Sequence, residues 1–226
     1  MEFGIFLALL VPFLGTALGA GAVLGLPVGS NRVQQGLNGF AAGAMLGAGF
    51  WNLLLPGAEL GWVGTVQGFL LGIGLVLAAE ELPGRWGIKL NPAVVLMIAV
   101  ILHNIPEGMA VGITGTERPG AMIGIALQNI PDGAVVAVPL AAVGVRKRRA
   151  FLAGTLSGMV EPVAAVLAMG VCGGMAWLAP GLMGFAAGAM AYVVIRELVP
   201  RMEKTQGGML WFALGFVLIM GLDSVT

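Results

Sequence analysis

Eight long apolar stretches, joined by short connections, occupy most of this 226-residue chain. A helix that crosses a bilayer needs about 20 mostly apolar residues, so eight such helices take up roughly 160 residues. The rest of the chain is too short to hold a soluble domain beside them. The stretches also lack the polar and apolar alternation of β-barrel strands. They lie at about 3–26, 36–56, 62–81, 92–115, 120–144, 150–172, 180–200 and 208–223.

The charge content agrees with a membrane protein. Apolar residues make up 58% of the chain and charged residues 10%, whereas roughly 25% of residues are charged in an ordinary globular protein. A net charge of zero and the lack of a basic face argue against nucleic acid as a partner. A single cysteine excludes an internal disulfide and a cysteine-based zinc cage. We therefore predict an all-α polytopic membrane protein whose partner is the lipid bilayer.

The basic residues predict an orientation, because Lys and Arg favour short cytoplasmic connections. With the N-terminus outside, nine of the eleven fall in inward-facing connections, and Arg118 is the one in an outward-facing connection. Both termini should then lie outside the cytoplasm, in a multi-pass protein of the inner membrane. The run 146–149 also suits binding to anionic lipid, which stays an alternative role. The nine are Arg32, Arg85, Lys89, Arg146, Lys147, Arg148, Arg149, Arg201 and Lys204.

Two pairs of repeated segments predict how the eight spans are arranged. The segment 39–45, Gly-Phe-Ala-Ala-Gly-Ala-Met, recurs letter for letter at 184–190. These copies lie in spans two and seven, which run in opposite directions, so spans 1–3 and 6–8 are expected to form an inverted-topology repeat. Between them, His-Asn-Ile-Pro-Glu-Gly at 103–108 is matched by Gln-Asn-Ile-Pro-Asp-Gly at 128–133. We expect one transporter domain in a 3+2+3 arrangement, with repeats at 1–81 and 150–226 around a central pair at 92–144.

The central pair carries polar side chains at mid-membrane depth, where ionisable groups are costly and usually functional. His103 and Glu107 are four residues apart and share one helix face, and Gln128 and Asp132 repeat that spacing. Three carboxylates with one imidazole and amide oxygens suit a dehydrated divalent cation such as Zn²⁺, Mn²⁺ or Fe²⁺. The candidate metal ligands are His103, Asn104, Glu107, Gln128, Asn129, Asp132, Glu161 and, as a soft thioether, Met45.

Proline lies inside both halves of the central pair. Pro106 and Pro131 each lack an N–H and push away the carbonyl four residues back. Irregular backbone at this depth is tolerated where it lines a cavity or is buried in protein. We therefore expect two kinked helices that direct their polar side chains into a midplane cavity, with Gly108 and Gly133 allowing close approach.

These motifs, with Ser-Gly-Met-Val-Glu-Pro at 157–162 and Arg-Glu-Leu-Val-Pro at 196–200, resemble the ZIP (Zrt/Irt-like) metal transporters, in particular the bacterial members. The resemblance implies transport of zinc and related cations into the cytosol by alternating access, with the metal as substrate rather than cofactor. It implies a binuclear site at mid-membrane. The primary site would comprise His103, Glu107, Gln128 and Asp132, with Met45 as a further candidate; the secondary site would comprise Asn104, Asn129 and Glu161, with Glu107 and Asp132 bridging.

The chain departs from that family pattern at three positions. Asp132 stands where Glu is usual, which shortens the reach by one methylene group. Asn129 stands where bacterial relatives often have a carboxylate, so the second site loses a charge. Arg196 stands where His is common, and we expect it to neutralise Glu197.

Two other functions remain as alternatives. A slow, selective metal channel would use the same ligands, and saturation of the initial uptake rate would distinguish a carrier from it. An intramembrane metal-dependent enzyme is disfavoured, because a zinc protease needs His-Glu-x-x-His and this chain has one His. The sequence leaves open the choice among zinc, iron, manganese and cadmium, and the choice between monomer and homodimer.

Overall fold

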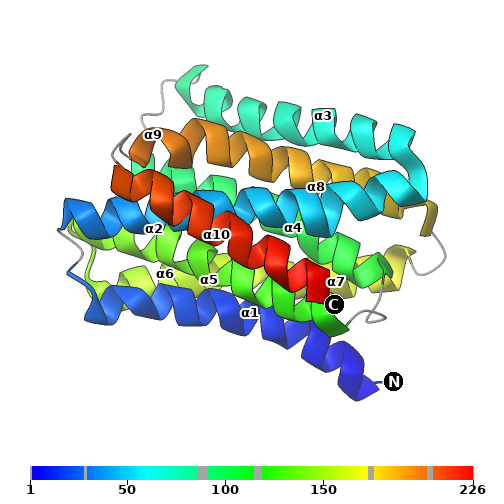
Figure 1. Ribbon diagram of the computed structural model, residues 1–226, viewed down its shortest axis with the longest axis horizontal. Helices are drawn as coiled ribbons and strands as arrows, with labels where there is room; N and C mark the ends of the chain where they lie inside the picture. The colour runs from blue at the N-terminus through cyan, green and yellow to red at the C-terminus, as the bar shows by residue number, and fades with distance from the viewer. Residues whose placement is uncertain are drawn as a thin grey trace.

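The computed structural model describes residues 2–27, 30–85, 91–114, 119–172, 176–202 and 206–225, which are almost entirely helical and contain no strand. Most of the helices run roughly along one direction (Figure 1). They are α1 (Glu2–Gly25), α2 (Asn31–Ala48), the π-helix η1 (Gly49–Leu54), α3 (Leu55–Arg85), α4 (Pro92–Thr114), α5 (Pro119–Ala142), α6 (Lys147–Gly158), α7 (Val160–Cys172), the 3₁₀ turn η2 (Ala176–Leu178), α8 (Ala179–Val193), the π-helix η3 (Val194–Leu198), α9 (Val199–Arg201) and α10 (Gln206–Val225).

The helices coincide with the predicted apolar stretches, with two local features that hydropathy alone does not resolve. Inside α3, Gly61 leaves helical geometry with φ 176° and ψ 91°, and the chain reverses there at the right of Figure 1. The predicted stretch 150–172 is divided into α6 and α7 at Met159. The ring of Pro162 explains this break, because a proline cannot donate to the carbonyl four residues back, on Gly158.

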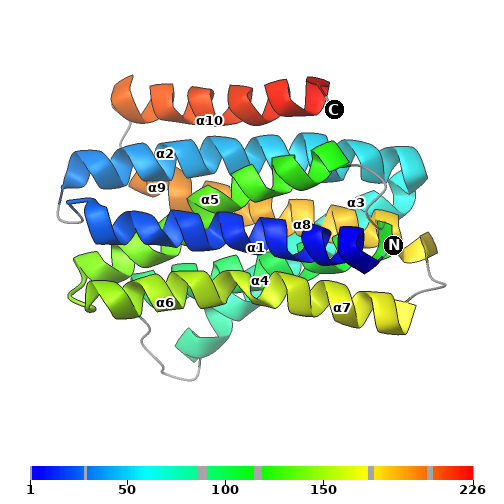
Figure 2. The ribbon, with the colours of Figure 1, turned by 90° about the horizontal axis from the view of Figure 1, so that it is seen from below.

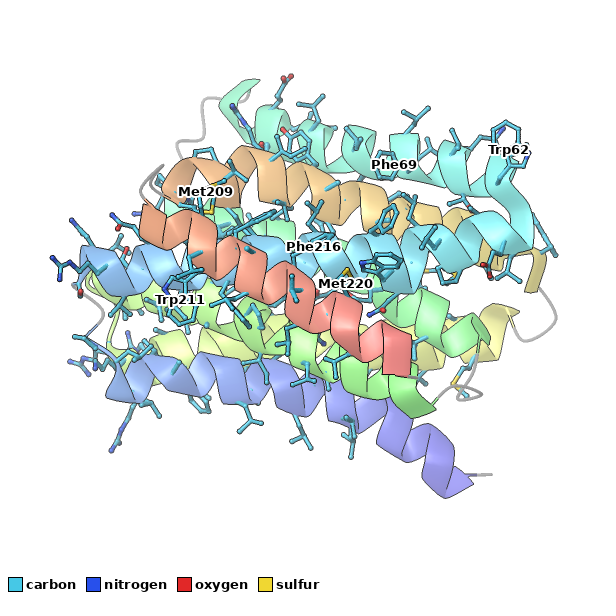
Figure 3. All side chains as sticks on the ribbon, viewed as in Figure 1. Trp62, Phe69, Met209, Trp211, Phe216 and Met220 are labelled. Atoms are coloured by element: carbon cyan, nitrogen blue, oxygen red, sulfur yellow. The ribbon has the colours of Figure 1, made fainter. Side chains whose placement is uncertain are left out.

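Four helical segments of the described chain are long and apolar enough to cross a membrane, and they span 31–82, 92–109, 147–170 and 179–201. The first of these contains the reversal at Gly61. Shorter apolar helices lie at 10–25 and 207–222. Large apolar side chains also cover the outer faces, for example Trp62 on α3 and Trp211 on α10 (Figure 3). An apolar outer surface of this extent is suited to lipid rather than to water.

The helices pack in matching pairs. α3 lies along α8, and α2 lies along α10; α1 packs on α5, and α4 packs on α7. α4 also contacts α8, and α5 also contacts α2. Figure 2 shows α10 and the α6–α7 pair at opposite edges, with α5 between them. The central helices α4 and α5 are thus enclosed by the helices on either side.

The two copies of the repeated seven-residue segment have the same local surroundings. The copy in α2 leads into η1, and the copy in α8 leads into η3. A Cβ atom built on Gly43 would lie 1.9 Å from the carbonyl oxygen of Phe212, and one built on Gly188 would lie 2.1 Å from that of Phe69. Glycine is therefore required at both positions, since any side chain would separate α2 from α10 or α8 from α3.

Replacing Gly188 by alanine should therefore destabilise the bundle. The new methyl group would overlap the Phe69 carbonyl oxygen, and overpacking of this kind costs about 1–3 kcal/mol. Gly74, in α3, has nothing within 4 Å of its Cβ position, so Gly74→Ala is the matched control and should stabilise by up to about 1 kcal/mol through helix propensity. Thermal unfolding of the purified protein in detergent measures both; equal midpoints for the two variants would contradict the packing argument.

Candidate metal site

The predicted polar residues gather where α4, α5 and α7 meet. Their backbones approach closely at this level, because a Cβ on Gly108 would lie 2.2 Å from the carbonyl oxygen of Glu161. Pro131 lies inside α5, as expected; the side chain of Pro106 lies outside the described part of the structure. The cluster is shut off from solvent, with side chains at most 2% exposed. Its members are His103, Asn104 and Glu107 on α4, Gln128, Asn129 and Asp132 on α5, and Glu161 on α7.

His103 and Asp132 face each other across the α4–α5 interface. The His103 Nδ1 atom lies 3.2 Å from the carbonyl oxygen of Ala99, and a carbonyl oxygen only accepts, so Nδ1 carries the proton. In the neutral ring, the other nitrogen, Nε2, is then a lone-pair donor, and it lies 3.6 Å from Asp132 Oδ2. Two acceptors at this distance repel each other unless a cation lies between them. Two ligands of one tetrahedral zinc ion lie about 3.3–3.6 Å apart, from metal–ligand bonds of about 2.0–2.2 Å.

Amide groups hold the remaining carboxylates in place. Gln128 Nε2 donates to Glu107 Oε1, which links α5 to α4 beside the His103–Asp132 pair. Asn129 Nδ2 donates to Glu161 Oε2 at 2.6 Å, which links α5 to α7. Each amide uses its N–H₂ group on a carboxylate, so its own carbonyl oxygen is left for another partner.

Several lone pairs in the cluster have no hydrogen-bond donor opposite them. A buried polar atom without a partner costs about 1–3 kcal/mol, and more when it is charged. Eight such atoms in one place, all electron-pair donors, form an environment for a cation rather than for another side chain. The unpartnered atoms are His103 Nε2, Asn104 Oδ1, Glu107 Oε2, Gln128 Oε1, Asn129 Oδ1, both carboxylate oxygens of Asp132, and Glu161 Oε1.

The cluster does not contain a complete cage of His, Cys, Asp and Glu. Within the described residues, no three side chains of these types come close enough to hold one metal ion. Coordination would therefore have to include amide oxygens such as that of Gln128. Met45 is fully buried in the hydrophobic core on α2, which packs against α5, and it takes part in none of the polar contacts described above.

Thr16, on α1, lies next to this cluster and escaped the sequence analysis. Its carbonyl oxygen would lie 1.9 Å from a Cβ on Gly133, the residue after Asp132. Its hydroxyl group is fully buried and has no hydrogen-bond partner. α1 thus approaches Gly133 on α5 much as α7 approaches Gly108 on α4. The available signal was a threonine between Gly15 and Gly19 in an otherwise apolar stretch.

The ion pairs in η3, which follows the C-terminal end of α8, differ from the expectation for Arg196. The nearest cation to Glu197 is Arg201, which donates to it from one helical turn away. Arg196 instead lies 3.8 Å from Glu80, through its Nε atom. Arg196 thus forms its ion pair with Glu80 rather than with Glu197, because α3 packs along α8, which leads into η3.

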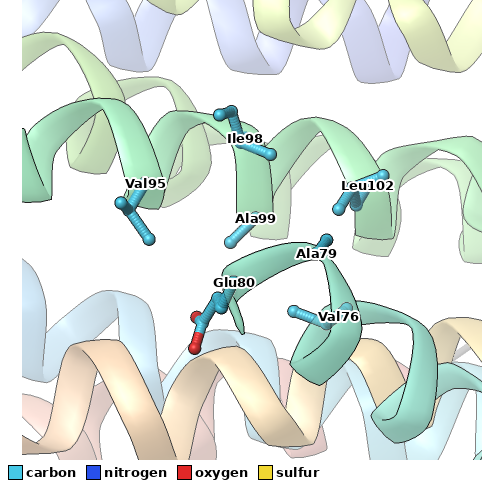
Figure 4. Close-up of a pocket in the computed structure, with 7 residues that line it drawn as sticks. All are labelled: Val76, Ala79, Glu80, Val95, Ile98, Ala99 and Leu102. Atoms are coloured by element: carbon cyan, nitrogen blue, oxygen red, sulfur yellow. The ribbon is translucent and has the colours of Figure 1, made fainter. Parts of the chain in front are cut away.

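Glu80 is also more enclosed than its position at the end of a span suggests. Its side chain is 14% exposed, and it accepts a hydrogen bond of 2.9 Å from the Tyr192 hydroxyl group. It borders a narrow pocket of about 10 Å³ between α3 and α4, and its carboxylate points away from α4 (Figure 4). A volume of about 10–15 Å³ holds one water molecule, so this pocket is too small for a hydrated ion.

Comparison with known proteins connects this site to a family. The model of the "ZIP Zinc transporter" family matches residues 80–223, which include every member of the buried cluster. The chain is 37% identical to the "Zinc transporter ZIPB" of Bordetella bronchiseptica, over 94% of this chain and 78% of that protein. It is 35% identical to the "Zinc transporter GufA" of Myxococcus xanthus, over 92% and 94% of the two chains. It is 31% identical to the "Zinc transporter ZIP11" of Homo sapiens, over 92% and 93%.

Proposed function

Because this chain belongs to the ZIP family of zinc transporters, we propose that it carries zinc through the buried cluster on α4, α5 and α7. Members of this family are transporters rather than enzymes, so the intramembrane enzyme is no longer a candidate. The observation that carries the proposal is Nε2 of His103 facing a carboxylate oxygen of Asp132 at 3.6 Å, with neither atom hydrogen-bonded. A divalent cation is the natural partner for that pair.

The proposed primary ligands are His103, Glu107, Gln128 and Asp132. Free lone pairs on all four support this assignment, as does the contact from Gln128 to Glu107, which holds both side chains at one level. Met45 stays a candidate for a further, weaker ligand from α2. Zinc tolerates mixed nitrogen and oxygen ligands, and the same set would accept iron, manganese or cadmium when they are available.

The proposed secondary ligands are Asn104, Asn129 and Glu161, with Glu107 and Asp132 as bridging carboxylates. We infer that this second site binds metal more weakly than the first. The Asn129 side chain is neutral and already donates to Glu161, so a cation there must compete with that hydrogen bond. Asn129 also stands in place of a carboxylate, and the loss of that charge lowers the affinity of the second site for a divalent ion.

The proposed architecture has eight membrane crossings in a 3+2+3 arrangement. Three matching pairs support an inverted repeat: exchanging α1 with α6–α7, α2 with α8, α3 with α10 and α4 with α5 turns the contacts α3–α8, α1–α5 and α4–α8 into α10–α2, α7–α4 and α5–α2. The π-helices η1 and η3 after the repeated segment are further support. In this arrangement, 1–81 and 150–226 are the repeats and 92–144 is the metal-binding pair, all within one transporter domain.

The proposed orientation places both termini outside the cytoplasm in the inner membrane. Arg32 near the start of α2, the run 146–149 at the start of α6 and Arg201 at the end of α9 lie at the same end of the bundle, at the left of Figure 1. A basic end of this kind faces the cytoplasm. Lys89, Arg118 and Lys204 fall outside the described residues. Metal would thus move toward this end, into the cytosol.

Zinc uptake by the purified protein in proteoliposomes tests the proposal. For alternating access, we expect the initial rate to saturate with zinc concentration, since each cycle carries the ions that the site can hold. Cadmium, iron and manganese should compete in proportion to their affinity for the site. A rate that rises linearly with zinc without saturation would indicate the channel alternative, and uptake equal to that of empty vesicles would contradict zinc transport itself.

A further inference from the structure

A groove of about 450 Å³ opens between α3 and the α8–η3–α9 segment, outside the metal cluster. Phe69 and Ile73 of α3 line one side, and Tyr192, Ile195 and Arg196 line the other. Phe69 is labelled on α3 in Figure 3, on the outer part of the bundle. None of the lining residues is a proposed metal ligand, so the transport site leaves the purpose of this groove unexplained.

The groove is lined mainly by apolar side chains and has one cation, Arg196, in the part of the groove that leads to Pro200. Ile195 and the Arg196 side chain are 69% and 68% exposed, so both face the surroundings of the protein. They belong to the π-helix η3, and π-helical turns are often found at functional sites. Arg196 contacts Glu80 through Nε, which uses one of the five N–H donors of a guanidinium group. A planar fork of this kind matches the oxygen atoms of a phosphate group.

The groove runs along the helices, in the direction that an acyl chain of a membrane lipid would take. Its lining residues extend from residue 191 to residue 200, a length of about 13 Å at 1.5 Å per residue. Phe69 precedes Glu80, the partner of Arg196, by eleven residues on α3, which places it about 16 Å deeper along the helix. One leaflet of the hydrocarbon core is about 15 Å thick. The cation thus lies toward the end of the bundle and the apolar walls extend toward its middle.

We propose that this groove binds one glycerophospholipid, with its phosphate on Arg196 and an acyl chain along Phe69, Ile73 and Ile195. A free phosphate ion would not pack against the apolar walls, and a hydrocarbon chain alone would not pair with the guanidinium group. The proposal goes beyond metal transport: it uses no ligand of the metal cluster and rests only on the placement of the helices in a bilayer.

Lipid retention by the purified full-length protein tests this directly. The protein is delipidated in detergent and titrated with dioleoyl phosphatidylglycerol, and bound lipids are counted by native mass spectrometry. We expect one retained phospholipid per chain, and a loss of roughly tenfold in affinity for Arg196→Gln, since one charge-assisted contact is worth about 1.5 kcal/mol or more. Ile73→Trp, which fills the apolar part without changing charge, should have a similar effect, and Arg32→Gln, at an exposed basic residue outside the groove, should have none.

Each other outcome would overturn the proposal. Equal retention by wild type, Arg196→Gln and Ile73→Trp would mean that the groove holds no specific lipid. Loss in Arg196→Gln with normal retention in Ile73→Trp, or displacement of the lipid by excess inorganic phosphate, would indicate an anion site instead. An equal loss in Arg32→Gln would indicate general attraction to charge. If Arg196→Gln does not fold, as judged by gel filtration, Ile73→Trp decides alone. Lipid counting does not depend on zinc uptake, so either proposal can fail without the other.

Discussion

Glu107→Gln is expected to reduce zinc uptake to background. The substitution keeps the size and shape of the side chain and removes one of the two carboxylates proposed to face the primary ion, with its unpartnered Oε2 atom. Even residues that only orient a ligand change metal affinity about 10–100-fold when they are replaced, so loss of a direct, charged ligand should cost more than about 100-fold. Uptake of ⁶⁵Zn into proteoliposomes and equilibrium zinc binding in detergent measure the two effects.

The stability of this variant separates loss of the site from loss of the fold. In the metal-free protein, a fully buried carboxylate with an unpartnered oxygen is unfavourable. Glu107→Gln should therefore unfold at the same temperature as the wild type without zinc, or at a higher one, and it should gain little when zinc is added. Glu59→Gln is the matched control, because Glu59 is an exposed carboxylate on α3. Normal uptake of zinc, iron, manganese and cadmium by Glu107→Gln would rule out the proposed primary site.

The burial of the central polar residues could be predicted from the sequence because it depends on local helix geometry. Spacing by four residues placed His103 with Glu107, and the parallel motif placed Gln128 with Asp132. Their depth followed from their position in the apolar stretches. All of them are fully buried, as expected for polar groups in the middle of a helix bundle. Their roles as metal ligands are still a prediction.

Contacts between distant segments could not be predicted in the same way. Glu80 and Arg196 are more than a hundred residues apart, and their pairing depends on how α3 lies along α8, which leads into η3. The π-helices also have no signal in hydropathy, since a single extra residue in a helical turn leaves the apolar pattern almost unchanged. Arg201, rather than Arg196, is the partner of Glu197 because residues four apart share one helix face and adjacent residues do not.

Thr16 illustrates a third limit. Ionisable groups are the costly ones in a membrane, so they are the residues that mark a candidate site in a sequence. A neutral hydroxyl group in a glycine-rich stretch has an ordinary explanation in helix packing. Only the contacts of Gly133 and Gly158 with Thr16 show that α1 reaches the same level as the polar cluster.

Asn129→Asp is expected to add a second tightly bound zinc ion to each chain. In the wild type the Asn129 amide donates to Glu161, which both satisfies that carboxylate oxygen and fixes its position. Aspartate at this position has no hydrogen to donate and adds a fourth carboxylate beside Glu107, Asp132 and Glu161. Without metal, the added charge should destabilise the fold, since like charges in a buried site repel strongly. With metal, the same charge should strengthen the second site.

Metal content and thermal stability together decide this prediction. After dialysis, the wild type should retain about one zinc ion per chain and Asn129→Asp about two. Without zinc, Asn129→Asp should unfold at a lower temperature than the wild type. When zinc is added, its unfolding temperature should rise by more than that of the wild type. A ligand at about 100 times its Kd stabilises the folded state by about 2.7 kcal/mol, so a second occupied site is measurable. The double variant Asn129→Asp/Glu161→Gln should return to one ion, because it removes a carboxylate from the secondary set and leaves the four proposed primary ligands intact. Two ions in the wild type would show that the Asn129–Glu161 hydrogen bond does not weaken the second site, and one ion in Asn129→Asp would show that Asn129 does not face it.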